Sequence, residues 1–221
     1  MPPPIFSGRR VRRALCSLKT NKAYGPDGVP PHILKDFAFE LATVLCRLFC
    51  LILKAGTYSL SWKHTLVQPV AKKGDRSNPS NYRPIALSSV IAKVFESIFN
   101  SHFLHHLEKN LLLSDHHYGL HKARSNGDLL SYLTHLWSSS LRDFRESFVV
   151  TLDISKAFDR VWHKALLAKP PAYGFTPPLC NLILIYLSCL SISVVADGTI
   201  SSALQISSGV PQGSVFPPFC F

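Results

Sequence analysis

Acidic residues are scarce in this 221-residue sequence, and several marks of secreted and zinc-binding proteins are missing. Only 13 Asp and Glu stand against 24 Lys and Arg, so the formal net charge is +11 and the pI is about 9.6. This balance favours a polyanionic partner, either a nucleic acid or an anionic membrane surface, although a merely basic soluble protein has the same composition. The six cysteines form no CxxC pair, which argues against zinc, and a reduced intracellular setting is the default.

Signal peptides and membrane spans are also not expected. The opening stretch MPPPIFSGRR has no apolar core segment. The apolar run 37–55 carries Glu40 and Arg47, and the run 179–196 is diluted by Asn181 and by serines. Hydrophobic residues make up 47% of the sequence and charged residues 17%, so we expect a globular chain with one domain or two subdomains.

The N-terminal third is expected to be helical. Residues 1–13 contain three prolines and four arginines, which favour a solvated tail, with phosphate contact as the alternative. A first helix is predicted over 15–22, and Pro30-Pro31 can open a second one that Gly56 ends. The core face of that second helix is predicted to hold six residues at spacings of three and four: Phe37, Leu41, Val44, Leu45, Leu48 and Ile52.

Alternating strands and helices are predicted further along. A strand over 65–70 is followed by a polar basic loop and by a helix with an apolar stripe, and another helix covers about 128–141. The stripe consists of Ile91, Val94, Phe95, Ile98, Phe103 and Leu107. A helix over 179–190 precedes two strands that flank Asp197-Gly198, a strong signal for a hairpin turn.

The stretch FVVTLDISKAFDRVWH (148–163) carries the clearest chemical signal. Its first five residues read as a buried strand that ends at Asp153, and Ala157, Phe158, Val161 and Trp162 follow at helical spacing. A carboxylate at the end of a buried strand needs a partner, and a divalent metal ion is one such partner. A helix-capping role for Asp153 is the alternative.

Five blocks, taken in their order, resemble the signature blocks of one enzyme family. They are NKAYGPDGVPPHILK (21–35), KKGDRSNPSNYRPIALSSVIAKVFE (72–96), LLLSDHHYGLHKARSNGDLL (111–130), LDISKAFDRVWH (152–163) and SGVPQGS (208–214). The family is that of the reverse transcriptases, and the resemblance is closest to those of non-LTR (LINE-like, jockey-type) retrotransposons. Five ordered blocks are highly specific, and they cover nearly the whole chain from about Leu15.

The resemblance implies a polymerase that uses two Mg²⁺ ions to join a primer hydroxyl to a nucleotide α-phosphate. Asp153 matches the first metal-binding aspartate of the family, and the carbonyl of Ile154 matches the backbone ligand. Phe158 matches the aromatic residue under the sugar that acts as a steric gate against ribonucleotides, with an ordinary core position as its alternative. Asp159 matches a residue whose expected role is structural, through pairing with basic side chains.

Two further sets of residues match the nucleotide site. Arg83, with Lys72 or Lys73 before it, matches the fingers residues that clamp the triphosphate, because arginine suits bidentate phosphate contact. A solvated basic face is the alternative for these residues. Gln212 matches the residue that packs beside the nucleotide and the template.

Template contacts are implied for two places. Gly209 and Gly213 allow the backbone to approach the substrate closely, although a turn that merely closes the palm would also explain them. A second group resembles the family block that contacts the template backbone through its phosphates. Its members are Tyr118, Gly119, Lys122, Arg124 and Ser125. His121, Asn126 and Pro217 depart from the family pattern.

The fold that the resemblance implies is α+β: a right-hand polymerase with helix-rich fingers on an incomplete antiparallel palm sheet and no thumb. Residues 1–60 are expected to form an N-terminal helical extension of the fingers, and 61–221 a partial reverse transcriptase domain. The expected partners are an RNA template, a DNA primer and deoxynucleoside triphosphates, without a membrane. The expected location is intracellular, in nucleus or cytoplasm, and the oligomeric state is open.

The sequence ends at Phe221 without the xxDD hairpin that carries the family's other two metal-binding aspartates. The chain by itself is therefore expected to be inactive. The alternative is a non-catalytic, basic nucleic-acid-binding remnant, which the charge of +11 supports. A basic helical interaction protein unrelated to polymerases is a third possibility.

Overall fold

A computed structural model describes residues 1, 3–119, 124–143 and 146–210. Two compact units make up the chain: Met1–Phe103 with Ala157–Phe221, and Leu104–Lys156. The helices of the described residues are α1 (Gly8–Cys16), α2 (Pro31–Asp36), α3 (Ala38–Ala55), α4 (Val90–Lys109), α5 (Asn126–Arg142), α6 (His163–Ala172) and α7 (Pro177–Leu187). The strands are β1 (His64–Ala71), β2 (Tyr82–Leu87), β3 (Leu190–Ala196), β4 (Thr199–Ile200) and β5 (Leu204–Ile206), so the predicted mixture of helix and sheet is confirmed.

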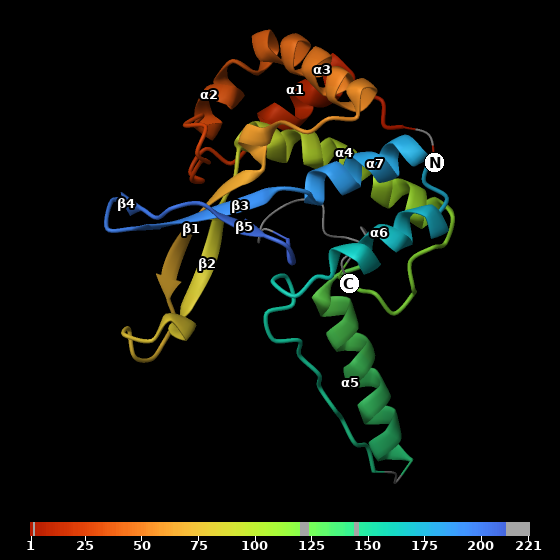
Figure 1. The fold of residues 1–221 in the computed structure, drawn as a ribbon. Helices are drawn as coiled ribbons and strands as arrows, with labels where there is room; N and C mark the ends of the chain where they lie inside the picture. The colour runs from red at the N-terminus through yellow and green to blue at the C-terminus, as the bar shows by residue number, and fades with distance from the viewer. Residues whose placement is uncertain (2, 120–123, 144–145, 211–221) are drawn as a thin grey trace. The chain divides into compact units, whose positions relative to one another are not determined.

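The strands form one sheet in the first unit, in the order β2-β1-β3-β4, and β5 also pairs with β3 (Figure 1). β1 and β2 are antiparallel, but β1 and β3 are parallel, with His64 opposite Ser191 and Val67 opposite Val194. The prediction of an antiparallel sheet is therefore wrong for this pair. Parallel pairing is possible because more than 100 residues connect β1 to β3, whereas neighbouring strands joined by a tight turn must be antiparallel.

The turn between β3 and β4 follows the sequence signal. Asp197 and Gly198 both have positive φ, at 49° and 75°, as a two-residue type I′ turn requires. The predicted strand over 65–70 and the helices over 128–141 and 179–190 are confirmed as β1, α5 and α7, with shifts of a few residues at their ends. No described helix is both long and apolar enough to cross a membrane.

The first helix lies earlier than expected. α1 covers Gly8–Cys16, so the predicted helix over 15–22 and the solvated tail over 1–13 are both wrong. Ser7 caps α1 by accepting a hydrogen bond from the Arg10 amide, and Val11 and Leu15, one turn apart, are completely buried. A cap and two buried anchors are enough to hold a short helix that its arginines alone would not predict.

α3 ends at Gly56, whose φ of 60° confirms its role, but its buried face differs from the predicted one. Leu45 and Ile52 are buried as predicted, whereas Phe37, Val44 and Leu48 are exposed. The buried stripe instead consists of Ala38, Ala42, Leu45, Phe49 and Ile52. α1 packs against α3, and small alanine side chains let the two helices approach closely. The buried stripe of α3 therefore lies on the side that carries Ala38 and Ala42.

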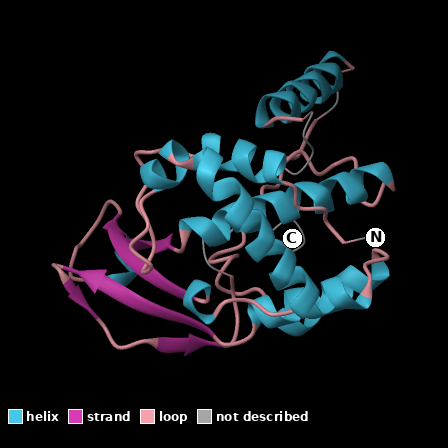
Figure 2. Cartoon of the chain, turned by 90° about the horizontal axis from the view of Figure 1, so that it is seen from above, coloured by secondary structure: helices cyan, strands magenta, loops and turns pink. Residues whose placement is uncertain are grey.

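Phe95 lies at the centre of an aromatic core in the first unit. It is fully buried, and the predicted stripe of α4 is confirmed for Val94, Ile98 and Phe103. The centroid of the Phe95 ring lies 5.3 to 6.2 Å from the rings of Phe6, Phe49, Tyr58, Trp62 and Phe99. In this unit the strands lie to one side and the helices to the other (Figure 2).

The predicted strand over 148–152 is wrong. This segment has no regular structure, and Phe148 and Leu152 are 90% and 92% exposed. A strand forms only where a neighbour satisfies its backbone groups, and no described strand pairs with this one. The helix expected directly after Asp153 is also wrong, because turns cover Ser155 to Arg160 and α6 begins only at His163.

Candidate nucleotide and nucleic-acid site

Two of the motif blocks, some 50 residues apart in the sequence, are joined through their main chains. The Gly209 amide donates to the Val161 carbonyl at 2.9 Å, and the Val210 amide donates to the Phe158 carbonyl, also at 2.9 Å. Both segments lie in the first unit, and Gly209 and Val210 are buried. We call this pair of contacts the main-chain joint.

Gly209 is the residue that makes the joint possible. Its φ is +82°, and a Cβ added to it would lie 2.8 Å from the Asp159 carbonyl oxygen and 2.9 Å from that of Phe158. The His163 side chain also contacts the joint, because its Nε2 lies 2.6 Å from the carbonyl oxygen of Gly209. A carbonyl only accepts hydrogen bonds, so Nε2 carries the proton in this contact. Sequence reasoning missed His163, although it ends the block 152–163.

A cavity of about 320 Å³ lies beside the joint, over one face of the sheet. Its walls come from six segments: the strands β1, β2, β3 and β5, the turn at Asp159, and residues Ser208 to Val210. Asp159 was expected to pair with basic side chains, but among the described residues no ion pair involves it. Its carboxylate therefore brings negative charge to a largely apolar cavity.

The predicted triphosphate clamp lies on the β1–β2 hairpin. Arg83 pairs with Val70 in the antiparallel ladder, and the Lys72 amide donates to the Asn81 carbonyl at 2.7 Å just beyond it. Side chains alternate along a strand, so Lys72 and Arg83 share one face of the hairpin. Pro84 lines the cavity, so Arg83 faces the opposite side of the sheet from it. Lys72, Lys73 and Arg83 are all exposed.

The loop that carries Lys73 is held by its own polar groups. Both the amide and the hydroxyl of Ser77 donate to the Asp75 carboxylate, at 2.9 and 2.5 Å, and these bonds hold the pKa of Asp75 below its usual value. Asn81 donates to the Asp75 carbonyl at 2.8 Å, and the Tyr82 hydroxyl donates to the Arg76 carbonyl at 2.9 Å. The basic loop therefore has a defined shape before any ligand is present.

Asp153 and Ile154, the predicted metal ligands, lie in the second unit, and both are exposed. Among the described residues, no hydrogen bond or ion pair involves the Asp153 carboxylate. The described residues also contain no group of three or more His, Cys, Asp or Glu that could hold a metal ion. A single carboxylate does not complete the near-octahedral shell that Mg²⁺ demands, so the described residues alone do not fit this ion.

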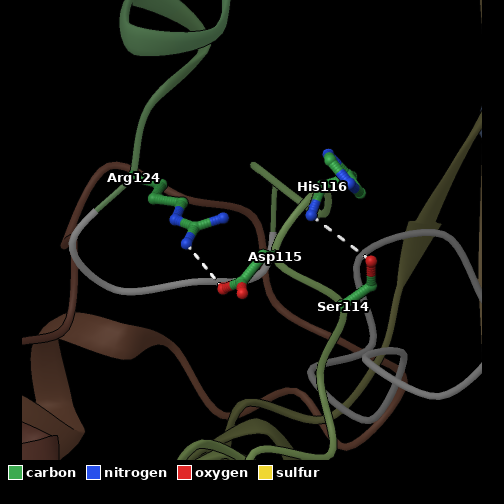
Figure 3. Close-up of polar contacts among 4 residues, drawn as sticks. All are labelled: Ser114, Asp115, His116 and Arg124. Atoms are coloured by element: carbon green, nitrogen blue, oxygen red, sulfur yellow. Dashed lines mark hydrogen bonds and ion pairs between the residues drawn. The ribbon is translucent and has the colours of Figure 1, made fainter.

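The predicted template contacts Arg124 and Ser125 already have local partners in the second unit. Arg124 forms an ion pair with Asp115 at 2.8 Å (Figure 3). Its guanidinium also lies 5.4 Å from the centroid of the Tyr118 ring. Ser125 caps α5 in a reciprocal capping box with Asp128. Their contact with a template stays a prediction.

Three predicted residues fall outside the described ranges: Lys122, Gln212 and Gly213. Of the predicted nucleotide residues, the structure thus brings Phe158 to the main-chain joint beside Gly209, and it brings Lys72 to the same hairpin face as Arg83. Phe158 is half-buried in a turn, where the sequence predicted a helix.

Comparison with known proteins gives a consistent picture. Residues 70–221 match the family model described as reverse transcriptase (RNA-dependent DNA polymerase). The chain is 28% identical over 96% of its length to a probable RNA-directed DNA polymerase from transposon BS of Drosophila melanogaster, and 26% identical over 99% of its length to the RNA-directed DNA polymerase from mobile element jockey of the same species. It spans 23% and 24% of the lengths of these relatives. The chain therefore belongs to the reverse transcriptase family, as its five ordered blocks predict, and its relatives come from non-LTR retrotransposons.

Proposed function

We propose that this chain forms the nucleotide- and template-holding part of an RNA-directed DNA polymerase of a mobile element. The main-chain joint is the observation that carries the proposal, because it holds together two blocks that the family resemblance assigns to the nucleotide site. The names of the relatives, which are polymerases, do not favour the alternative of a non-catalytic remnant. The proposed partners are an RNA template, a DNA primer and deoxynucleoside triphosphates, in an intracellular setting.

In this proposal the β1–β2 hairpin binds the triphosphate. Lys72 and Arg83 project from one hairpin face, and the self-bonded loop between the strands reduces the entropy lost when a phosphate is bound. Phe158 is fixed through its carbonyl to Val210, and the proposal that it lies beneath the sugar rests on the family resemblance, because Arg83 faces the opposite side of the sheet from the cavity beside the joint. Gly209 supplies the close main-chain packing that keeps Phe158 in place.

Asp153 and the Ile154 carbonyl are proposed as two of the Mg²⁺ ligands of an RNA-directed DNA polymerase of the length of the relatives. The described residues do not complete such a site, so we assign no catalytic step to the ion. An unpaired carboxylate destabilises a protein only when it is buried, and Asp153 is exposed. Among the described residues it has no partner, so its oxygens can bind a metal ion.

A chimera tests the polymerase function. The 221 residues replace the corresponding segment of the jockey polymerase, and Mg²⁺-dependent primer extension on an RNA template is measured. We expect extension by the chimera and its loss on Asp153→Asn, with little change for the control Asp197→Asn, because Asp197 sits in the β3–β4 turn and Asn tolerates its positive φ. Equal activity of the two variants would refute the role of Asp153.

Nucleotide binding by the chain itself provides a second readout. A fluorescent deoxynucleoside triphosphate is titrated into the 221-residue protein and its anisotropy is followed. Arg83→Gln should weaken binding by about tenfold or more, because a charge-assisted contact to phosphate is lost. Arg142→Gln, an exposed arginine in the last turn of α5, is the control and should have no effect. Unchanged binding by Arg83→Gln would refute the proposed clamp.

A further inference from the structure

α1 presents a face made almost entirely of arginine. Arg9, Arg10, Arg12 and Arg13 are all exposed, whereas Val11 and Leu15 are completely buried. A helix turns once in 3.6 residues, so Arg9 and Arg13 lie opposite the buried Val11 and Leu15, and Arg10 and Arg12 flank the buried side. We call these four residues the arginine face. They lie outside the segment that matches the reverse transcriptase family model, which begins at residue 70.

The electrostatics of the arginine face are unfavourable in the absence of a partner. Arg9 and Arg10 lie in the first turn, where the helix dipole is positive, and that turn contains no acidic residue. The pairs 9–12, 9–13 and 10–13 bring like charges to neighbouring positions on the helix. Among the described residues, no ion pair involves any of the four. An external polyanion would relieve this repulsion.

An exposed aromatic ring lies against the arginine face. The Arg12 guanidinium lies 5.9 Å from the centroid of the Phe39 ring on α3, and Phe39 is 73% exposed. Arg10 is held by a hydrogen bond from its Nη1 to the Ile5 carbonyl at 3.0 Å. Arginines that track a phosphate backbone beside an aromatic ring on which a base can stack are the combination found in proteins that bind single-stranded nucleic acid.

We propose that the arginine face and Phe39 bind single-stranded RNA through its phosphates and through one stacked base. The inference relies on the proposed function only for the class of partner, and not for any step of catalysis. RNA is favoured because the Arg12 guanidinium lies over the Phe39 ring, a geometry suited to stacking a planar base, and the vesicle measurement below distinguishes binding to an anionic membrane.

Salt dependence of binding tests the arginine face. A labelled, unstructured RNA oligonucleotide is titrated into the full chain at several salt concentrations. Changing all four arginines to glutamine should reduce the slope of log K against log salt concentration by about three, since a single strand releases roughly 0.7 counterion per phosphate contact. The control removes four exposed charges from other helices: Lys54→Gln, Lys109→Gln, Arg142→Gln and Lys164→Gln. Its slope should change by less than one, and an equal change in both variants would overturn the proposal.

Phe39→Ala separates stacking from charge. It should weaken RNA binding on the order of tenfold while the salt slope is unchanged, because stacking releases no counterion. Leu51→Ala, at a 61% exposed position on the same helix, is the control and should have no effect. Both sets of variants should retain binding of the fluorescent nucleotide, which shows folding and tests the proposed function separately. Binding to phosphatidylserine vesicles with no binding to RNA would overturn the inference.

Discussion

Replacing Gly209 by alanine probes the main-chain joint directly. At a φ of +82° an L-residue is strained by about 1–2 kcal/mol. The added Cβ would also lie 2.8 to 3.0 Å from main-chain atoms of Phe158 and Asp159, which cannot rotate away as a side chain can. Relieving this overlap separates two hydrogen-bonded segments, and each bond contributes about 0.5–1.5 kcal/mol. The expected destabilisation is therefore roughly 2–5 kcal/mol.

Gly174→Ala is the matched control for this change. Gly174 has nearly the same φ, +76°, but no atom lies within 4 Å of the Cβ that would be added. Gly174→Ala should therefore lower the free energy of unfolding only by the backbone strain, about 1–2 kcal/mol. This loss is partly offset because alanine lowers the conformational entropy of the unfolded chain. Urea unfolding followed by tryptophan fluorescence gives both free energies of unfolding, with equal m-values as the check on two-state behaviour. A Gly209→Ala loss no larger than that of Gly174→Ala would refute the joint.

Three more predictions concern the core and the helix ends. Phe95→Ala should lower the free energy of unfolding by about 3–5 kcal/mol, measured by urea unfolding, whereas Phe39→Ala at an exposed site should change it by less than about 0.5. Burial and the Glu96 carboxylate raise the pKa of Tyr58 well above 10. The contribution of Tyr58 to the free energy of unfolding is therefore fully present below about pH 10 and is lost as the pH rises through the raised pKa. Tyr58→Phe should cost about 1–3 kcal/mol at neutral pH and flatten this alkaline loss in pH-dependent unfolding. Hydrogen bonds from the N-cap serine lower the pKa of Asp128 from 3.8, so α5 is stabilised above that pH and frays as the pH falls through the lowered value. Asp128→Asn should flatten this acid transition in circular dichroism, and an unchanged transition would contradict the capping role.

Local signals in the sequence were sufficient for several elements. The turn at Asp197-Gly198 was predicted because two residues with positive φ suit Asp and Gly, and both angles are positive in the structure. Gly56 was predicted to end α3 for the same reason. The stripe of α4 was predicted because its aromatic residues recur at helical spacing, and the core forms around one of them, Phe95.

Features that depend on distant neighbours were not predictable from spacing. The segment 148–152 has the composition of a strand, but a strand needs a partner, and the described sheet does not supply one. The exposed face of α3 was misjudged because the contact with α1 favours Ala38 and Ala42 over larger residues. In the candidate site, the blocks identified Phe158 and Gly209 as residues of interest, but only the structure shows that their segments are bonded to each other.

The main-chain joint also bears on how this chain tolerates mutation. Its two hydrogen bonds use only amide and carbonyl groups, which every residue except proline supplies in full. Side chains at 158, 161 and 210 can therefore be exchanged without removing a donor or an acceptor from the joint. Position 209 is the exception, because any side chain there would occupy the space of the opposing backbone. Copies of this sequence that accumulate substitutions should keep the two segments together for as long as that one glycine survives.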